Sequence, residues 1–466
     1  MKKELGQEAI YDARELGLPR MLVLGAQHLF AMFGATVLVP ILVQGYGLPL
    51  SIQTTLLFAG LGTLLFHICT KMKVPAFLGS SFAYLGGFAA VANLDAGKYA
   101  GMSPDDKLAY ALGGIVIAGL LYLLLALLFK VLGAWKVMRF FPPIVTGPMI
   151  IMIGLNLAGS AIGNASTNWA LALVAIAVII VANIWGKGMI KIIPILMGVI
   201  GSYLVAAVTG NIDFTPVLEA PWVGLPLTYE RTVFALFTGG NLDKSLLITS
   251  VITIAPIAFA TMMEHIGDIS AISSTVGINF IRDPGLHRTL IGDGLATTVA
   301  SLFGAPANTT YGENTGVLTL TRVYDPRVIR LAACFAILMS FCPKFSTIIE
   351  IMPSSIVGGI SLVLYGMISA VGIRNIVETK TDFSQSRNVI IAALILVLSI
   401  GINYSEAGSV GFDVGDIHIA FSGLATGSLV GIFLNAILPG KDYRFENDEP
   451  NKTGVDLEVS QGKSLK

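Results

Sequence analysis

Residues 306–313 of the chain read PANTTYGE, and residues 75–82 read PAFLGSSF. Both stretches interrupt long apolar runs with a proline, a glycine and several hydroxyl side chains. Inside a membrane, backbone that is not helical persists only where protein or a water-filled cavity covers it. We therefore predict that the two stretches form short antiparallel strands that line a binding site. Each strand is expected to continue into a half-helix whose first N–H groups face the membrane centre.

The composition around these stretches is that of a polytopic membrane protein. Of the 466 residues, 54% are hydrophobic and 12% are charged, and the mean hydropathy is +0.78, which exceeds what a water-soluble surface tolerates. The formal net charge of zero gives no overall field that would attract nucleic acid. Cys69, Cys334 and Cys342 lack the spacing of a metal site, so no metal or other cofactor is expected. No signal peptide is expected either, because the first apolar run begins near Met21 and is long enough to span.

Apolar runs of about 20 residues, the length that crosses a bilayer as a helix, predict an all-α protein with fourteen transmembrane segments. They fall into two sets of seven, separated by the proline- and glycine-rich stretch 210–243. The first set comprises 21–44, 51–70, 74–92, 110–130, 141–161, 168–186 and 190–209. The second set comprises 244–265, 287–304, 306–321, 326–349, 353–373, 388–404 and 417–439.

The two sets predict an inverted repeat, because a unit with an odd number of segments enters the membrane upside down when it is duplicated in tandem. The pairs Gln27-His28 and Glu264-His265 occupy corresponding places in the first segment of each set. The predicted organisation is an N-terminal segment 1–20, a first repeat 21–209, an extracellular loop 210–243, a second repeat 244–439 and a tail 440–466.

The positive charges agree with this arrangement. With the N-terminus placed inside, nearly all of the 29 Lys and Arg residues fall on the inner side, as expected for cytoplasmic loops. The exceptions are Lys98, Lys107, Arg231, Lys244 and Lys344. We therefore expect a multi-pass protein with both termini in the cytoplasm.

Two acidic residues within the apolar segments, and a third just beyond one of them, point to transport. A carboxylate at bilayer depth costs at least about 2.5 kcal/mol, so Glu264 and Glu313 are expected to face a cavity, a partner or a proton path. Asp268 follows Glu264 by four residues and would share its helix face. Two carboxyl groups this close rarely ionise together, so one should hold a proton, as a proton-coupled carrier requires. A planar, uncharged ligand with alternating N–H and C=O groups would suit such carboxylates and backbone donors.

Structural interpretations of the same residues remain open at this stage. Glu313 could cap the half-helix that follows Gly312, and Glu264 could pair with His28 or His265. Asp268 could end its helix at the membrane interface. His28 could tune a carboxylate or could simply satisfy neighbouring polar groups.

Two further acids, Asp293 in the run IGDG and Glu350 near IEIMP, flank glycine or proline. Because these residues favour helix ends, we interpret both acids as interfacial.

Other functional classes lack their signatures. An intramembrane enzyme would need a nucleophile elbow, a metal-binding HExxH pair or a phosphate loop, and an ATP-driven pump would need a Walker motif. The sequence contains none of these. A channel or anion carrier on a similar scaffold should have a basic residue at the site, and Glu313 argues against it. The sequence therefore favours a secondary transporter and not an enzyme.

Several long motifs resemble the nucleobase-ascorbate transporter family (nucleobase:cation symporter-2), in particular its bacterial uracil permeases. The signature of this family is an acidic or amide residue, Asn, any residue, Gly, four residues, Thr and a basic residue, and it matches 313–322. The resemblance covers the chain from Gln27 to the last segment. The motifs are QHLFAMFGATVLVP at 27–40, PAFLGSSFAY at 75–84, EHIGD at 264–268, RDPGLHR at 282–288, NTTYGENTGVLTLTR at 308–322 and VLYG at 363–366.

The resemblance implies a core domain from segments 1–4 and 8–11 and a gate domain from segments 5–7 and 12–14. It also implies proton-coupled uracil uptake across the bacterial cytoplasmic membrane by an elevator movement, in a homodimer joined through the gate domains. Xanthine, thymine or another pyrimidine is the alternative substrate. The residues implied at the substrate site are Glu264, Glu313, Phe82, Gly312, Ser81, Tyr311 and Tyr365.

Proton coupling is expected to involve Glu264, Asp268, Glu313 and His28. Asp268 departs from the pattern, because uracil permeases commonly have a histidine at this position.

Overall fold

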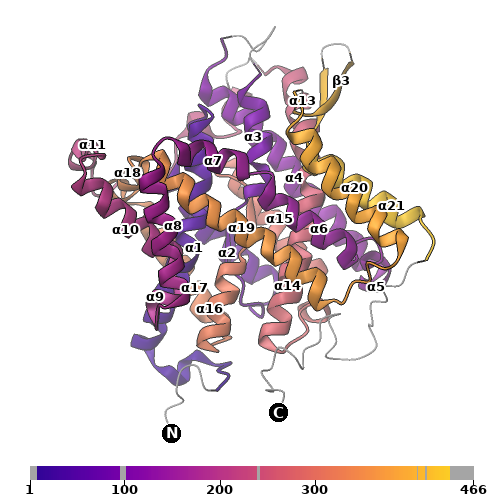
Figure 1. Cartoon of the computed structure of the whole chain (residues 1–466), viewed down its shortest axis with the longest axis horizontal. Coiled ribbons are helices and arrows are strands. Elements are labelled where there is room, and N and C mark those ends of the chain that lie inside the picture. The colour runs from indigo at the N-terminus through magenta and orange to yellow at the C-terminus, as the bar shows by residue number, and fades with distance from the viewer. Residues whose placement is uncertain (1–7, 95–100, 239–241, 407, 415–416, 441–466) are drawn as a thin grey trace.

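The computed structural model describes residues 8–94, 101–238, 242–406, 408–414 and 417–440, and this part of the chain is mostly helical (Figure 1). The elements before the central loop are η1 Ala13–Leu16, α1 Leu18–Gly45, α2 Ile52–Cys69, β1 Leu78–Ser80, η2 Phe82–Tyr84, α3 Leu85–Ala92, α4 Pro104–Leu132, α5 Ala134–Met138, α6 Pro143–Leu155, α7 Ala158–Ser166, α8 Trp169–Ile184, α9 Met189–Ile192 and α10 Pro194–Val208.

The loop holds α11 Thr215–Glu219, η4 Tyr229–Arg231 and α12 Ala235–Thr238. The elements after it are α13 Lys244–Ile254, η5 Ala255–Ile257, α14 Ala258–Val276, η6 Ile281–Gly285, α15 Leu286–Leu302, β2 Asn308–Thr310, α16 Gly312–Thr321, α17 Pro326–Ser340, α18 Pro343–Glu350, α19 Ser354–Glu378, α20 Ser386–Asn403, β3 Val410–Val414, β4 Ile417–Phe421 and α21 Gly423–Ile437.

Short polar side chains set several helix starts. They accept hydrogen bonds from the first free N–H groups of the helix that follows, the usual role of an N-cap. These caps are Ser51 for α2, Ser103 for α4, Asn168 for α8, Asp243 for α13 and Ser422 for α21.

Seven helical spans among the described residues are long and apolar enough to cross a membrane, or eight if α17 and α18, which meet at 87°, are counted as one span. Four shorter apolar helices, Phe82–Ala92, α8, α10 and α21, coincide with further predicted segments. The remaining two predicted segments, 287–304 and 306–321, contain α15 and β2 with α16. Each predicted range thus holds a structural element, while the number of fourteen crossings stays a prediction.

Two predicted segments differ from the structure by more than a shift of a few residues at their ends. The segment predicted at 244–265 continues as α14 to Val276. The segment predicted at 417–439 begins as strand β4, which pairs with β3 in an antiparallel hairpin, and its helix starts only at Gly423. Residues 417–421, IHIAF, alternate apolar with other residues, a period that suits a strand.

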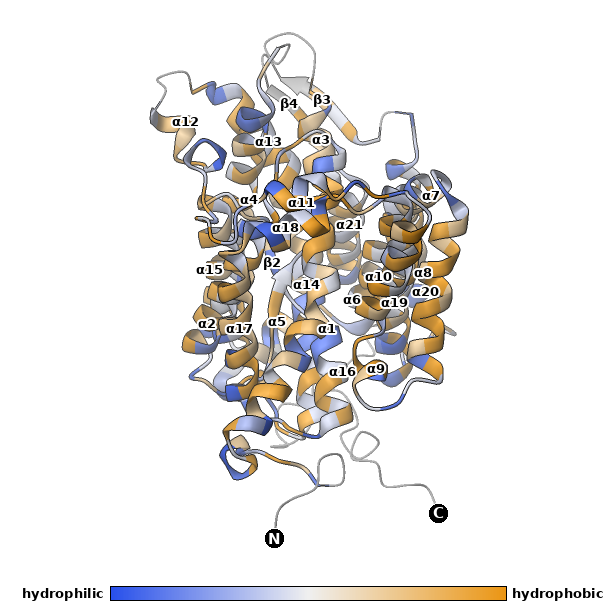
Figure 2. Cartoon of the chain, turned by 90° about the vertical axis from the view of Figure 1, so that its left-hand side faces the viewer, coloured by the Kyte–Doolittle hydropathy of each residue, from blue (hydrophilic) through white to orange (hydrophobic). Residues whose placement is uncertain are grey.

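The helices form two groups that lie side by side (Figure 2). The first group contains α1, α2, α4, α13, α15 and α17, and the second contains α6, α7, α8, α10, α19, α20 and α21. Helix α14 lies at the boundary, where it packs on α4 and α16 as well as on α6 and α21. One continuous hydrophobic core extends through both groups.

Strands β1 and β2 pair antiparallel near the middle of the molecule, as predicted. Leu78 lies opposite Thr310, and Ser80 opposite Asn308. Each strand is anchored by a threonine of the preceding helix. Thr63 of α2 bonds the backbone N–H and C=O of Leu78 at 2.9 and 3.2 Å, and Thr297 of α15 bonds those of Asn308 at 3.2 and 3.0 Å. The two halves of the chain therefore support their strands in the same way.

Helices α4 and α15 are in direct backbone contact at Gly119 and Gly294. A Cβ atom on either glycine would lie 2.8 Å from the carbonyl oxygen of the other. Small residues allow membrane helices to approach this closely. The contact joins the two halves of the chain within the first helix group.

We predict that Gly119→Ala lowers the midpoint of thermal unfolding of the purified protein, because the added methyl group forces α4 away from α15 and such overpacking costs about 1–3 kcal/mol. Gly163→Ala in α7 is the matched control, because a Cβ there meets nothing within 4 Å and alanine is the better helix former. Equal midpoints for the two variants would contradict the prediction.

Candidate functional site

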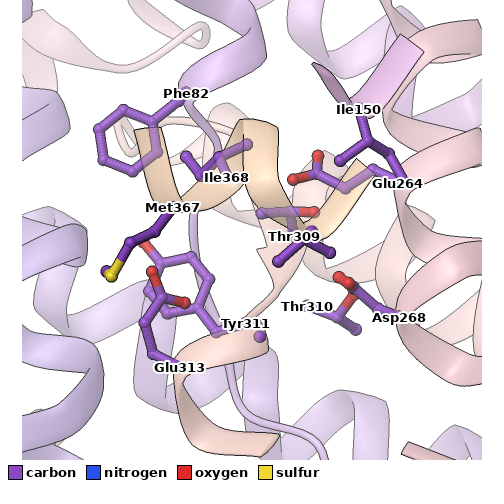
Figure 3. Close-up of a pocket in the computed structure, with 12 residues that line it drawn as sticks. Phe82, Ile150, Glu264, Asp268, Thr309, Thr310, Tyr311, Glu313, Met367 and Ile368 are labelled. Atoms are coloured by element: carbon purple, nitrogen blue, oxygen red, sulfur yellow. The ribbon is translucent and has the colours of Figure 1, made fainter. Parts of the chain in front are cut away.

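A cavity of about 200 Å³ lies beside the paired strands, between the two helix groups (Figure 3). Its polar wall comes from η2, α14, β2 and the start of α16, and its apolar wall comes from α6 and α19. The lining residues are Phe82, Ile150, Glu264, Asp268, Thr309, Thr310, Tyr311, Gly312, Glu313, Met367, Ile368 and Val371.

Three carboxyl groups reach this cavity, as the sequence predicts. Glu264 and Asp268 lie one turn apart on α14, and Glu313 rises from the start of α16 on the other side (Figure 3). Glu264 Oε2 is buried and has no hydrogen-bond partner within the described part of the chain. A buried carboxylate oxygen without a partner is costly, so it is available to a ligand or a proton.

Asp268 belongs to the cavity and not to the membrane interface. Its side chain is 8% exposed, and its Oδ2 accepts a hydrogen bond of 2.6 Å from Thr310 Oγ1. The interpretation that Asp268 ends its helix at the interface is therefore wrong, because α14 continues for two more turns to Val276.

Two helix starts offer backbone donors at the site. η2 begins at Phe82 and α16 at Gly312, and among the described residues no side chain caps either start. The first N–H groups of a helix have no partner within the helix. They favour electronegative ligand atoms, as does the positive end of the helix dipole. Glu313 in the first turn of α16 also suits this dipole, so its interpretation as a capping residue remains compatible with the structure.

The other predicted site residues are divided between the cavity wall and its support. Tyr311 lines the cavity, and its hydroxyl donates to the carbonyl oxygen of Ser80 at 2.8 Å. The ring of Tyr365 packs edge-on against Phe82 with centroids 5.5 Å apart. Tyr365 and Ser81 are both buried outside the set of lining residues.

His28 is also buried away from the lining. The side-chain amide of Asn314, which follows Glu313, lies 3.2 Å from His28 Nδ1 and donates to the His28 carbonyl oxygen at 3.0 Å. The contact holds the start of α16 against α1. This geometry favours the structural interpretation of His28.

His265 and Asp293 form a buried pair between α14 and α15. The distance from Nδ1 to Oδ2 is 2.9 Å, and both side chains are 0% exposed. The interpretation of Asp293 as interfacial is therefore wrong. Its neighbours Gly292 and Gly294 lie inside α15, where they allow close contact with α2 and α4, and do not end a helix. With Asp293 beside His265, Glu264 lacks the histidine partner that one interpretation gave it.

Six lining residues were missed from the sequence. Thr309 and Thr310 belong to the motif that predicts the broken segment, so their position could have been inferred from it. Ile150 of α6 and Met367, Ile368 and Val371 of α19 gave no signal, because an apolar side chain in an apolar helix is indistinguishable from one that faces lipid.

The sequence of this chain is similar to the sequences of known permeases. A family profile described as the permease family (Xan_ur_permease) matches residues 19–408. The uracil permease of Bacillus caldolyticus is 41% identical over 91% of this chain and 94% of its own length. The uracil permease of Bacillus subtilis (strain 168) is 40% identical over 89% of this chain and 91% of its own length.

Among solved structures, that of SLC26A9 matches with a TM-score of 0.59 at 12% identity, over 92% of this chain and 66% of the other. At this identity the likeness concerns the fold alone.

Thr310→Val should lower the midpoint of thermal unfolding, because it leaves the buried Asp268 carboxyl without its donor, a loss of about 1–3 kcal/mol. Thr319→Val is the control. Thr319 is an exposed threonine of α16, and its hydroxyl bonds within its own helix at 3.0 Å. If both substitutions shift the midpoint equally, the hydrogen bond to Asp268 has no special role.

Proposed function

Because the chain belongs to this permease family, and is therefore a transporter and not an enzyme, we propose that it takes up uracil across the cytoplasmic membrane of a bacterium, coupled to protons. The observation that carries the proposal is the cavity in which three carboxyl groups meet two uncapped helix starts. The uracil permeases among its relatives match nearly the whole chain, which supports uracil as the substrate.

The donors and acceptors of the cavity complement a uracil ring. Uracil is planar and uncharged, with two ring N–H groups and two carbonyl oxygens. Carboxylates accept hydrogen bonds and backbone N–H groups donate them. Glu264 and Glu313 would accept from the ring N–H groups, and the N–H groups at Phe82 and Gly312 would donate to the carbonyl oxygens. Phe82 and Tyr311 would cover the ring, with Ser81 and Tyr365 supporting them from behind.

Proton coupling would use the two acids of α14. Glu264 and Asp268 occupy one helix face, and two carboxyl groups this close cannot both lose their protons at low cost. Thr310 donates to one oxygen of Asp268, so the two acids differ in their surroundings and would not share a proton equally. Glu313 would adjust the same equilibrium, whereas the part in coupling expected for His28 would be limited to holding Asn314 and the start of α16 in place.

The transport movement we propose is an elevator. The first helix group, with α3, α14, α16 and α18, would be the core, and the second would be the gate. In this proposal the chain crosses the membrane fourteen times, and both termini lie in the cytoplasm. Each of the two repeats, 21–209 and 244–439, contributes segments to both the core and the gate. The matching supports of β1 by Thr63 and of β2 by Thr297 favour such a repeat. A homodimer through the gate would hold this group still in the bilayer while the core moves.

The decisive test is uptake of radiolabelled uracil by cells that lack their own permease. Expression of the chain should confer uptake that a protonophore abolishes. Glu264→Gln and Glu313→Gln should each reduce initial uptake by about 10- to 100-fold, the loss expected when a hydrogen bond to a charged group is weakened.

Glu350→Gln is the matched control, because Glu350 is an exposed acid at the end of α18, and it should leave uptake unchanged. Uptake that withstands both substitutions would refute the site. If unlabelled xanthine or thymine competes more strongly than unlabelled uracil, the preferred substrate is that other nucleobase and not uracil.

A second test separates proton coupling from binding. Asp268→Asn should abolish accumulation driven by a proton gradient but preserve exchange of labelled for unlabelled uracil, because exchange needs no net proton movement. Reconstituted vesicles with an imposed pH gradient measure both. Gradient-driven accumulation at the wild-type level would show that Asp268 has no part in coupling.

A further inference from the structure

Residues 10–13, called the N-terminal segment from here on, contact the far ends of both helices that carry the three acids. These ends lie at the lower end of the molecule in Figure 1, where the described chain begins. The site lies at the opposite end of α16 and in the middle of α14. Neither the transport proposal nor the motifs of the sequence give this segment a role.

The first contact is with the end of α16. Ile10 donates from its N–H to the carbonyl oxygen of Arg322 and accepts at its own carbonyl from the N–H of Tyr324, both at 2.8 Å. The side chains of Ile10 and Val323 are completely buried in a small cluster of their own. Residues 10 and 322–324 thus form a parallel β-bridge that ends α16.

The second contact is with the end of α14. The hydroxyl of Tyr11 donates to the carbonyl oxygen of Val276, the last residue of α14, at 2.8 Å. The ring of Tyr11 packs against that of Tyr324, with centroids 5.5 Å apart. Two successive residues of the N-terminal segment therefore hold the ends of two different site helices.

The third contact fixes the segment itself to α17. The N–H of Ala13 donates to Asp325 Oδ2 at 2.7 Å, and Arg327 Nη1 lies 2.8 Å from Asp12 Oδ1 and 2.9 Å from Asp325 Oδ2. Hydrogen bonds from Arg14, aided by the charge of Arg327, hold the pKa of Asp12 well below its usual range. Asp12 therefore remains ionised, and keeps its partners, even in mildly acidic solution.

Helix α16 needs such a support. It has ten residues, and isolated helices shorter than about 12–15 residues are marginally stable in water. Its end at Arg322 lies nine residues after Glu313, about 14 Å along the axis at 1.5 Å per residue. Val276 lies twelve residues after Glu264, about 18 Å along α14. Helices of this length transmit a displacement of one end to the other.

We infer that the N-terminal segment is a positioning element that keeps Glu313 in register with Glu264 and Asp268 by fixing the far ends of α16 and α14. This inference rests on the proposed function only for the identity of the ligand. None of its residues touches the cavity, so its effect on binding is transmitted through the two helices.

The test compares the full chain with a variant that lacks residues 2–11 and with Tyr11→Phe, all purified in lipid nanodiscs. Hydrogen exchange should accelerate in the last turns of α14 and α16 in the truncated protein, with α19 and α20 unchanged. The dissociation constant for uracil should rise about fivefold for Tyr11→Phe and about 100-fold on truncation, which correspond to the loss of one hydrogen bond and of about three. Tyr229→Phe is the matched control, because its hydroxyl bonds only within the central loop.

A synthetic peptide of residues 1–17 should restore affinity and exchange protection to the truncated protein, which a general loss of stability would not allow. Unchanged exchange in α14 and α16 would overturn the inference, and so would accelerated exchange that extends to α19 and α20. If the full chain does not bind uracil, the proposed function fails, while the exchange measurements still decide the role of the segment.

Discussion

The structure depends on hydrogen bonding of main chain that is not helical in the middle of a membrane protein. Residues 78–80 and 308–310 satisfy each other as an antiparallel pair, and a threonine from each preceding helix satisfies one outer residue of each strand. Without this pairing neither half-helix could begin where it does, because the cost of unsatisfied N–H and C=O groups in such surroundings is several kcal/mol per group. The cavity and its donors follow from this one arrangement.

The sequence predicts those parts of the site whose residues are unusual for a membrane-spanning helix. Acids in apolar segments are anomalous, so Glu264 and Glu313 could be assigned to a cavity, and Asp268 by its spacing from Glu264. Phe82, Tyr311 and Gly312 were assigned through the family resemblance. All six line the cavity. Asp293 was misjudged because its flanking glycines suggest a helix end, whereas here they serve close packing between helices. The hairpin before α21 was missed because five alternating residues carry little weight beside a long apolar run.

The apolar wall and the N-terminal segment could not be predicted for a different reason. Ile150, Met367, Ile368 and Val371 are typical lipid-facing residues, and only the packing of the two helix groups turns them toward the cavity. Ile10 and Tyr11 act mainly through backbone atoms and one hydroxyl, with partners more than 260 positions away in the chain. Contacts of this kind are properties of the assembled fold, and no local pattern reports them.

The uncapped starts of η2 and α16 have a consequence for how such a protein can diverge. An amide of the main chain belongs to every residue type except proline, so exchanging the side chains at Phe82 or Gly312 leaves that donor in place. In the binding mode that we propose, duplicated copies of the gene could therefore lose or alter the acids one at a time while the main-chain donors still meet a ring oxygen. New substrate preferences would then arise by small steps around a fixed, heritable anchor.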